Sequence, residues 1–155
     1  MALQKSVGTT LPIAVVGDFA SNNPRTNAVN NNGGFKSDGT VKVGTFCWAT
    51  GNDLSLTGTG KPLGFVARNG ASALIQIFDS STLTINKGFE TTVFTRGDFY
   101  AQVDADVSIG QKVFVSTTDG KIKGDVAGAT IAGYEETEFK FSTTSPAGGL
   151  AIISN

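Results

Sequence analysis

The chain has 155 residues, which is enough for one domain with a sizeable apolar core. Its 12 basic and 13 acidic side chains form no long run of either sign, so it lacks the clustered cations of a nucleic-acid-binding surface. Charged residues reach only 16%, against roughly 25% in ordinary soluble proteins. Such a surface suits either a protein that packs against copies of itself or a larger body, or a secreted or adhesive β-protein.

The sequence shows no segment that would direct it to a membrane. No apolar run approaches the roughly 18 residues of a membrane span, and the short apolar stretch 11–16 leads straight into Asp18. Cys47 is the only cysteine, so an intramolecular disulfide is excluded. Its neighbours Phe46 and Trp48 favour a small buried hydrophobe over a reactive thiol. This cysteine usage fits a reducing cytoplasm.

Residues 1–40 have the composition of a loop or an extended arm, with glycine, proline and asparagine at short intervals. Exposure to solvent would be unfavourable for four apolar residues in this range, namely Ile13, Val15, Val16 and Phe19. We therefore predict an extended N-terminal arm over 1–40 that lies on a neighbouring molecule, so that deletion of residues 1–20 leaves the domain intact. The alternative is a flexible terminus without a role.

The remaining range, 41–155, has the pattern of short strands and is the predicted folded domain. The expected strands are 41–48, 54–56, 62–66, 73–78, 83–85, 99–103, 112–116, 121–123, 130–132, 138–141 and 150–153. We expect a glycine bulge at Gly44 and a type I′ turn at Asp119-Gly120. No window has a helical period. The prediction is an all-β, single-domain barrel or sandwich of jelly-roll type that follows the arm.

Alternation assigns faces to two of these strands. In 99–103, Phe99 lies on the core face and Tyr100 on the opposite face. In the next strand, Val113 lies on the core face and Phe114 on the opposite one. An aspartate in place of either core residue would enter the core without a partner, so we expect it to prevent soluble folding.

A weak internal repeat links two parts of the domain. The stretch 43–54 is similar to 109–122, because each has an apolar residue and a glycine, a five-residue strand, a turn with aspartate and a returning apolar residue. The similarity extends to 64–65 against 133–134, each a glycine followed by an aromatic residue. Either two related β-units pack into one barrel or sandwich, or hairpin chemistry has converged by chance.

The residue inventory offers little for catalysis. The chain has no histidine, which removes the commonest general base and metal ligand. Asp98, Asp104 and Asp106 are close in sequence but lack the alternating ligands of a calcium loop, so we expect them in a solvated loop. No glycine-rich phosphate loop stands between a strand and a helix. We therefore predict no enzymatic activity, no metal and no cofactor.

Four short segments occur in a recognisable order. They are 17–25 (GDFASNNPR), 62–68 (PLGFVAR), 94–100 (FTRGDFY) and 109–114 (IGQKVF). In this order they resemble the structural cement proteins of tailed bacteriophages, which sit on the outside of the icosahedral head and lock its capsomers. The resemblance covers about residues 15–120 and does not extend to the C-terminal part.

This resemblance implies a protein made in the bacterial cytoplasm that joins the outer surface of the phage head. Its partners would be the major capsid protein, whose neighbouring subunits it clamps, and itself, as a homotrimer or a dimer. Arginine and aromatic side chains are favoured at interfaces. The residues that we predict to bind partners are Asp18, Phe19, Arg25, Arg68, Arg96, Tyr100 and Phe114.

Several of these residues have alternatives. Phe114 could belong to a second core layer, Arg96 could cap its own loop, and Asp18 could pair with Arg25 or only shape a turn. A different class of function, a carbohydrate-binding or adhesin-type module, would use aromatic sugar platforms at Trp48, Tyr100 and Tyr134. That function requires an accessible Trp48, which we expect to be buried.

Overall fold

The structure is a computed structural model that describes residues 13–69 and 83–155. Within them the chain forms strands and turns and no helix, which confirms the predicted all-β fold. The strands are β1 (Thr26–Asn27), β2 (Lys36–Ser37), β3 (Phe46–Thr50), β4 (Asp53–Ser55), β5 (Gly64–Phe65), β6 (Phe94–Arg96), β7 (Asp98–Gln102), β8 (Lys112–Ser116), β9 (Ile122–Asp125), β10 (Tyr134–Phe141) and β11 (Leu150–Ser154).

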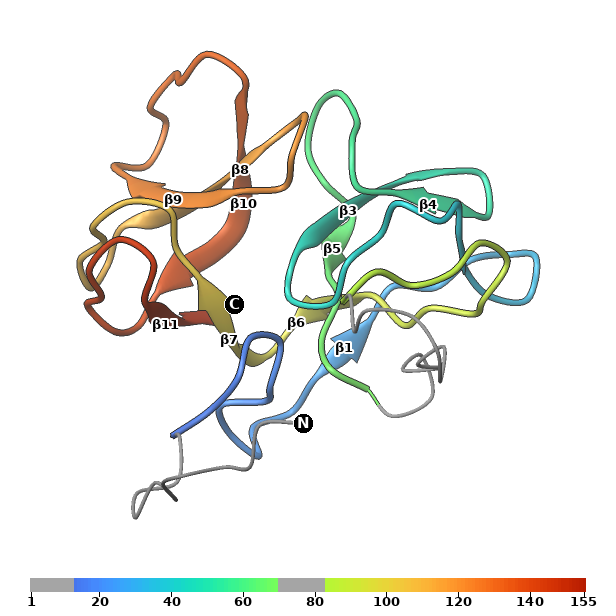
Figure 1. The fold of residues 1–155 in the computed structure, drawn as a ribbon, viewed down its shortest axis with the longest axis horizontal. Coiled ribbons are helices and arrows are strands. Elements are labelled where there is room, and N and C mark those ends of the chain that lie inside the picture. The colour runs from blue at the N-terminus through green and yellow to red at the C-terminus, as the bar shows by residue number, and fades with distance from the viewer. Residues whose placement is uncertain (1–12, 70–82) are drawn as a thin grey trace, which may run out of the picture.

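These strands form two sheets, which lie side by side in Figure 1. The first sheet has the order β1-β6-β5-β3-β4-β2 and the second has the order β7-β11-β10-β8-β9. Neighbouring strands are antiparallel except for β2, which runs parallel to β4. Burial alternates along β7 and β11, as expected for strands with one face on a core.

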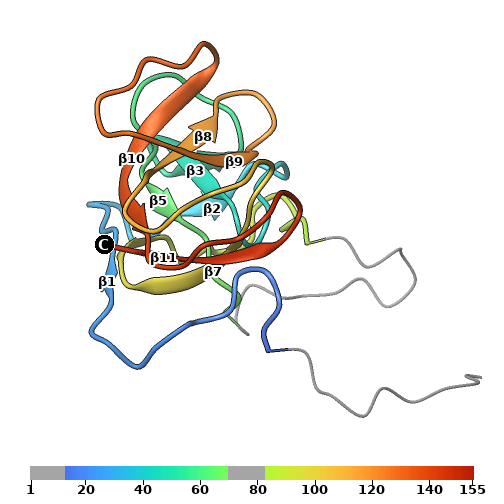
Figure 2. The ribbon, with the colours of Figure 1, turned by 90° about the vertical axis from the view of Figure 1, so that its left-hand side faces the viewer.

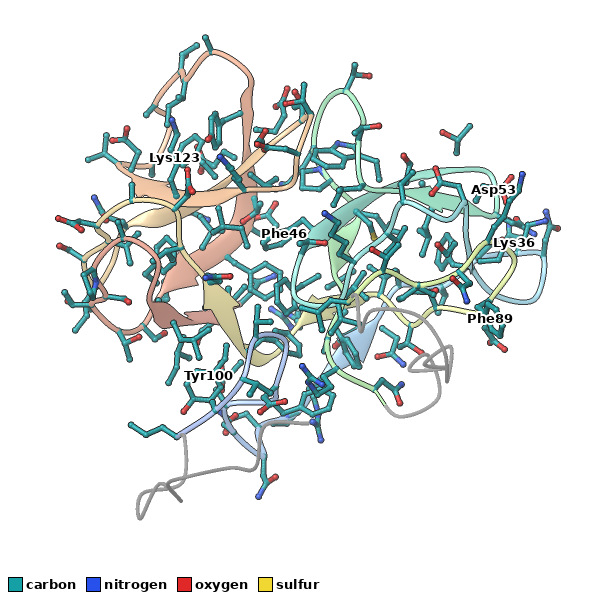
Figure 3. The ribbon with its side chains drawn as sticks, in the orientation of Figure 1. Lys36, Phe46, Asp53, Phe89, Tyr100 and Lys123 are labelled. Carbon is teal, nitrogen blue, oxygen red and sulfur yellow. The ribbon has the colours of Figure 1, made fainter. Side chains whose placement is uncertain are left out.

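The main core lies between the two sheets, where Figure 3 places Phe46. Its aromatic centre consists of Phe46, Phe65 and Phe94 from the first sheet and Phe99 and Phe139 from the second. Ring centroids in this group lie 5.1 to 6.1 Å apart. Burial of each such side chain contributes about 1.5–3 kcal/mol, so this core joins both sheets into one folded body. Phe99 and Val113 are fully buried, as predicted.

A second core lies on the other face of the first sheet. Because residues alternate along a strand, Cys47 and Val66 point away from the main core and pack with Val41, Leu54 and others. Cys47 is fully buried, as predicted, and burial raises the pKa of its thiol to about 12.

The strand pairing confirms the predicted internal repeat. Without β2, the first sheet has the order β1-β6-β5-β3-β4, which matches β7-β11-β10-β8-β9 strand for strand. We call these the first unit and the second unit. Three pairs of opposite residues correspond between the units. Trp48–Ser55 corresponds to Phe114–Lys123, Ala49–Leu54 to Val115–Ile122, and Phe46–Phe65 to Lys112–Lys140.

One part of the predicted repeat is wrong. The position equivalent to Phe65 is Lys140, not Tyr134. The reason is a bulge in β10, where the residues between Glu136 and Lys140 oppose only Val113. Sequence similarity in 133–134 therefore lies outside the matching register.

Two predicted turns also differ. Gly44 lies in a turn before β3, with φ +84°, rather than in a bulge. The Asp119-Gly120 turn is not type I′, because Gly120 has φ +72° but no non-glycine residue in the described ranges has a positive φ. The connection instead spans 117–120, and the Ser116 N–H donates to the Lys121 carbonyl across it (2.8 Å).

Three expected strands have other outcomes. Residues 130–132 are a loop and a turn, and the strand begins at Tyr134 instead. Within 83–85 only Thr84 forms a bridge, with Lys42. The expected strand 73–78 lies outside the described residues.

Part of the predicted arm pairs with the domain. β1 pairs with β6, β2 pairs with β4, and Phe35 packs in the second core with 8% of its surface exposed. The division of the chain at residue 40 stays a prediction, and these contacts lead us to confine the proposed arm to residues before β1.

Candidate functional site

The segment 17–20 lies along the edge of β7 that β11 leaves free, as Figure 2 shows. The Gly17 N–H donates to the Tyr100 carbonyl (2.7 Å), and the Ala20 N–H donates to the Asp98 carbonyl (2.9 Å). An unpaired strand edge invites pairing with other chains. Here the protein covers that edge with its own N-terminal segment.

Phe19 anchors this segment to the main core. The centroid of its ring lies 5.5 Å from that of Phe94 and 5.7 Å from that of Phe99. The Arg25 guanidinium lies 4.1 Å from the centroid of the Phe19 ring, over its face. About a third of Phe19 stays exposed (36%). The expectation that deletion of residues 1–20 spares the domain is therefore revised, because the deletion would remove core contacts.

Gly97 makes the approach of Arg25 possible. Its φ is +135°, and a Cβ at this position would lie 2.8 Å from the Phe99 ring and 2.9 Å from Arg25 Cγ. A side chain at residue 97 would therefore displace the arginine stem, and the backbone conformation would be strained as well.

Asp18 pairs with a different arginine from the one proposed. Its carboxylate lies 3.3 Å from Arg68 Nε and accepts a hydrogen bond from the Val15 N–H (3.0 Å). The Arg68 N–H in turn donates to the Gly17 carbonyl (2.6 Å). Because both side chains are partly exposed, this pair contributes at most about 1 kcal/mol and mainly sets the position of the segment.

Asp98 holds the next part of the segment. Its carboxylate accepts hydrogen bonds from Ser21 Oγ (2.5 Å) and Asn23 Nδ2 (2.6 Å). These bonds, with that from Ser21 first, lower the pKa of Asp98. Asp98 thus fixes the N-terminal segment to β7 and is not part of a solvated loop. Asp104 and Asp106 are exposed, as expected.

Together these contacts define a region that we call the arm junction. It consists of Asp18, Phe19, Arg25, Arg68, Arg96, Asp98 and Tyr100. All the predicted partner-binding residues except Phe114 belong to it. Tyr100 is half-buried beside the segment in Figure 3, and Arg96 is exposed opposite Thr26 in the β1–β6 pair. Ser21, Asn23 and Gly97 were not predicted, although all three lie inside the recognised segments.

The seventh predicted residue, Phe114, is buried with 1% of its surface exposed. Phe114 belongs to neither the main core nor the second core, but it is not accessible to a partner in this structure. Trp48 is also buried (6%), and its Nε1–H donates to the Gly60 carbonyl (2.7 Å). Tyr134 is half-buried under Lys123. The sugar-platform function therefore has no accessible tryptophan.

Comparison with known proteins identifies the family. Residues 3–155 match the family model described as structural cement protein (E217 gp24/Pam3 gp6). The chain belongs to the structural cement protein family. A chain from "The capsid of Myoviridae Phage XM1" shares the fold, with a TM-score of 0.69 and 17% identity over 99% of this chain and 97% of that one. No curated protein sequence matches the chain.

The four segments that resemble the cement family occupy defined places in the structure. Three of them, 17–25, 62–68 and 94–100, meet at the arm junction. The fourth contains Gly110, whose N–H donates to the Phe141 carbonyl just as the Gly44 N–H donates to Val66 in the first unit.

The family supports a structural, capsid-stabilising role rather than an enzymatic one. Among the described residues no three potential metal-ligating side chains cluster. In the same ranges no helix is long and apolar enough to span a membrane. The surface grooves there, of about 470 to 510 Å³, are open to solvent.

Proposed function

We propose that this protein is a phage head cement protein that binds the outer capsid surface and clamps neighbouring major capsid subunits. The observation that carries the proposal is the distribution of exposed apolar side chains. Four of the seven large exposed hydrophobic residues in the described ranges fall within 13–29. They are Ile13 (94% exposed), Val15 (42%), Phe19 (36%) and Val29 (91%).

This stretch also contains Arg25, so it combines exposed apolar area with arginine, as interface cores do. We call residues 13–29 the docking segment. Residues 17–20 are fixed on β7, so the docking segment is already held on the domain before it binds. This restraint lowers the conformational entropy that is lost on binding. Ile13 and Val15 are then presented to a capsid subunit.

A homotrimer, or a dimer, would multiply this contact. Several modest footprints joined in one oligomer gain avidity without any single strong contact. The near-neutral charge gives little long-range steering, so affinity must come from buried area, which is usually more than about 1,000 Å² for a specific interface. The proposed attachment is an addition to a lattice already built and needs no ATP, metal or covalent step.

The test is sedimentation of purified protein with phage heads that lack it, with and without EDTA and moderate salt. The wild-type protein should bind in every condition. Ile13→Asp with Val29→Asp should abolish binding while the melting temperature stays unchanged. The matched control is Ile109→Asp with Val126→Asp, which changes two exposed apolar residues elsewhere and should leave binding intact. Equal binding by both pairs would exclude the docking segment, and no binding by the wild type would exclude the cement function.

A further inference from the structure

The arm junction contains every arginine of the chain. These are Arg25, Arg68 and Arg96, whereas the other nine basic residues are lysines spread over the sequence. Arg68 is paired with Asp18. Within the described residues, neither Arg25 nor Arg96 has a carboxylate within ion-pair distance.

The two aspartates of the arm junction have other partners. Asp18 binds Arg68 and the Val15 N–H, and Asp98 binds Ser21 and Asn23. Arg25 and Arg96 could therefore pair with Asp18 or Asp98 only if these carboxylates gave up their present partners. The positive charge of the two arginines is left over after the junction has satisfied its own acidic groups.

Arg25 is held in place by its contacts with Phe19 and Gly97. Its guanidinium lies 4.1 Å over the Phe19 ring, and its stem crosses Gly97, where there is no side chain. Stacking uses the flat face of the guanidinium, so the N–H groups around its edge stay available. Restraint of the side chain before binding lowers the entropy cost of each new hydrogen bond.

Arg96 is a neighbour of Arg25. It ends β6 opposite Thr26, the first residue of β1, and Arg25 directly precedes that strand. Both are exposed, Arg25 lies within the docking segment, and Arg96 pairs with that segment through Thr26.

We propose that Arg25 and Arg96 together bind an acidic side chain of the capsid surface, and this rests on the proposed function. A planar guanidinium matches a carboxylate with two parallel hydrogen bonds, which a lysine cannot do. The apolar docking segment beside the pair would exclude water and strengthen that contact. The arginine pair would thus set the register of the protein on the lattice, while the apolar residues supply the area.

The experiment measures binding of four variants to heads that lack the protein, namely Arg25→Gln, Arg96→Gln, Arg25→Lys and the control Lys140→Gln, which removes an exposed charge from another part of the surface. Loss of a charge-assisted hydrogen-bonded pair should weaken binding about tenfold or more for each arginine. Arg25→Lys should weaken it nearly as much, and Lys140→Gln should have no effect. A second probe is the same heads after their exposed carboxylates are converted to amides with glycinamide. Wild-type binding to these heads should fall to the level of the arginine variants.

The outcomes separate the two proposals. If the wild type binds untreated heads and both glutamine variants bind equally well, the carboxylate pair is refuted and the cement function stands. Full binding by Arg25→Lys would show a point charge rather than a bidentate contact, and unchanged wild-type binding to amidated heads would also overturn the proposal. Failure of the wild type to bind any heads would instead refute the proposed function.

Discussion

The two units share strand order and register, yet one pair of equivalent faces differs in chemistry. On one face, Phe65 of the first unit is equivalent to Lys140 of the second, and Phe46 is equivalent to Lys112. Phe46 and Phe65 are fully buried in the main core, whereas Lys140 is exposed. The face that is a core wall in the first unit is therefore partly exposed in the second, where Lys140 is exposed while Phe114, the equivalent of Trp48, is buried.

The other face is apolar and buried in both units. Val66 of the first unit packs in the second core, whereas its equivalent, Phe141, packs in the main core. The second unit thus covers the face of the first unit that carries Phe46 and Phe65, and it does so with the face that carries Phe141. In repeat proteins a terminal unit needs a polar outer face to end the stack. Lysines at the positions of Phe46 and Phe65 give the second unit part of such a face.

The largest effect expected from this comparison is an exchange of equivalent residues. Phe65→Lys would place an unpaired charge in the main core and should prevent folding, with a loss above about 4 kcal/mol. Phe65→Ala should fold with a loss of about 3–5 kcal/mol, and Lys140→Ala should change stability by less than about 0.5 kcal/mol. Thermal and denaturant unfolding followed by circular dichroism would measure all three. A cooperative melt of Phe65→Lys near the wild-type temperature would show that the two faces do not differ as described.

A smaller difference is expected at the equivalent glycines Gly44 and Gly110. Both have positive φ, +84° and +89°, so alanine should cost about 1–2 kcal/mol at either. At Gly44 a Cβ would also lie 2.6 Å from Val16 Cγ2, whereas at Gly110 nothing lies within 4 Å. Gly44→Ala should therefore cost about 1–3 kcal/mol more than Gly110→Ala. Addition of Val16→Ala should relieve part of the excess, and equal unfolding free energies for the two glycine variants would argue against this contact.

The sequence could predict features that depend on neighbours along the chain. Alternation placed Phe99 and Val113 in the core, and turn residues located most strands, because a period of two is a local property. It also indicated the repeat, since hairpins are local. Alternation placed Phe114 opposite the core face of its strand, yet Phe114 is buried as well. Alternation identifies the two faces of a strand but not what covers each of them.

The candidate site was predictable only in part. The resemblance selected the right segments, yet Asp18 pairs with Arg68 rather than Arg25, because edge pairing with β7 fixes where its carboxylate points. The partners of Asp98, Ser21 and Asn23, lie more than 70 residues away in the chain. No local pattern encodes such contacts.

The smallest expected effect concerns Asp98, whose equivalent in the first unit is Asn27. The hydrogen bond from Ser21 is the main cause that lowers the pKa of Asp98 below its ordinary value of 3.8. A depressed folded-state pKa means that the Asp98 carboxylate contributes stability above the unfolded-state pKa and that this stability is lost as the pH falls through the folded-state value.

Asp98→Asn makes the second unit like the first at this position and weakens the bonds from Ser21 and Asn23. At pH 7 we expect a loss of about 1 kcal/mol, or roughly 2–4 °C in melting temperature. Below the depressed pKa the wild-type carboxyl is protonated too, so the difference between the two proteins should shrink. Melting curves from pH 7 to pH 2 would measure this, with the exposed Asp53→Asn as a control that should have almost no effect. A difference that stays constant over the whole pH range would show that the charge of Asp98 is not what holds the segment.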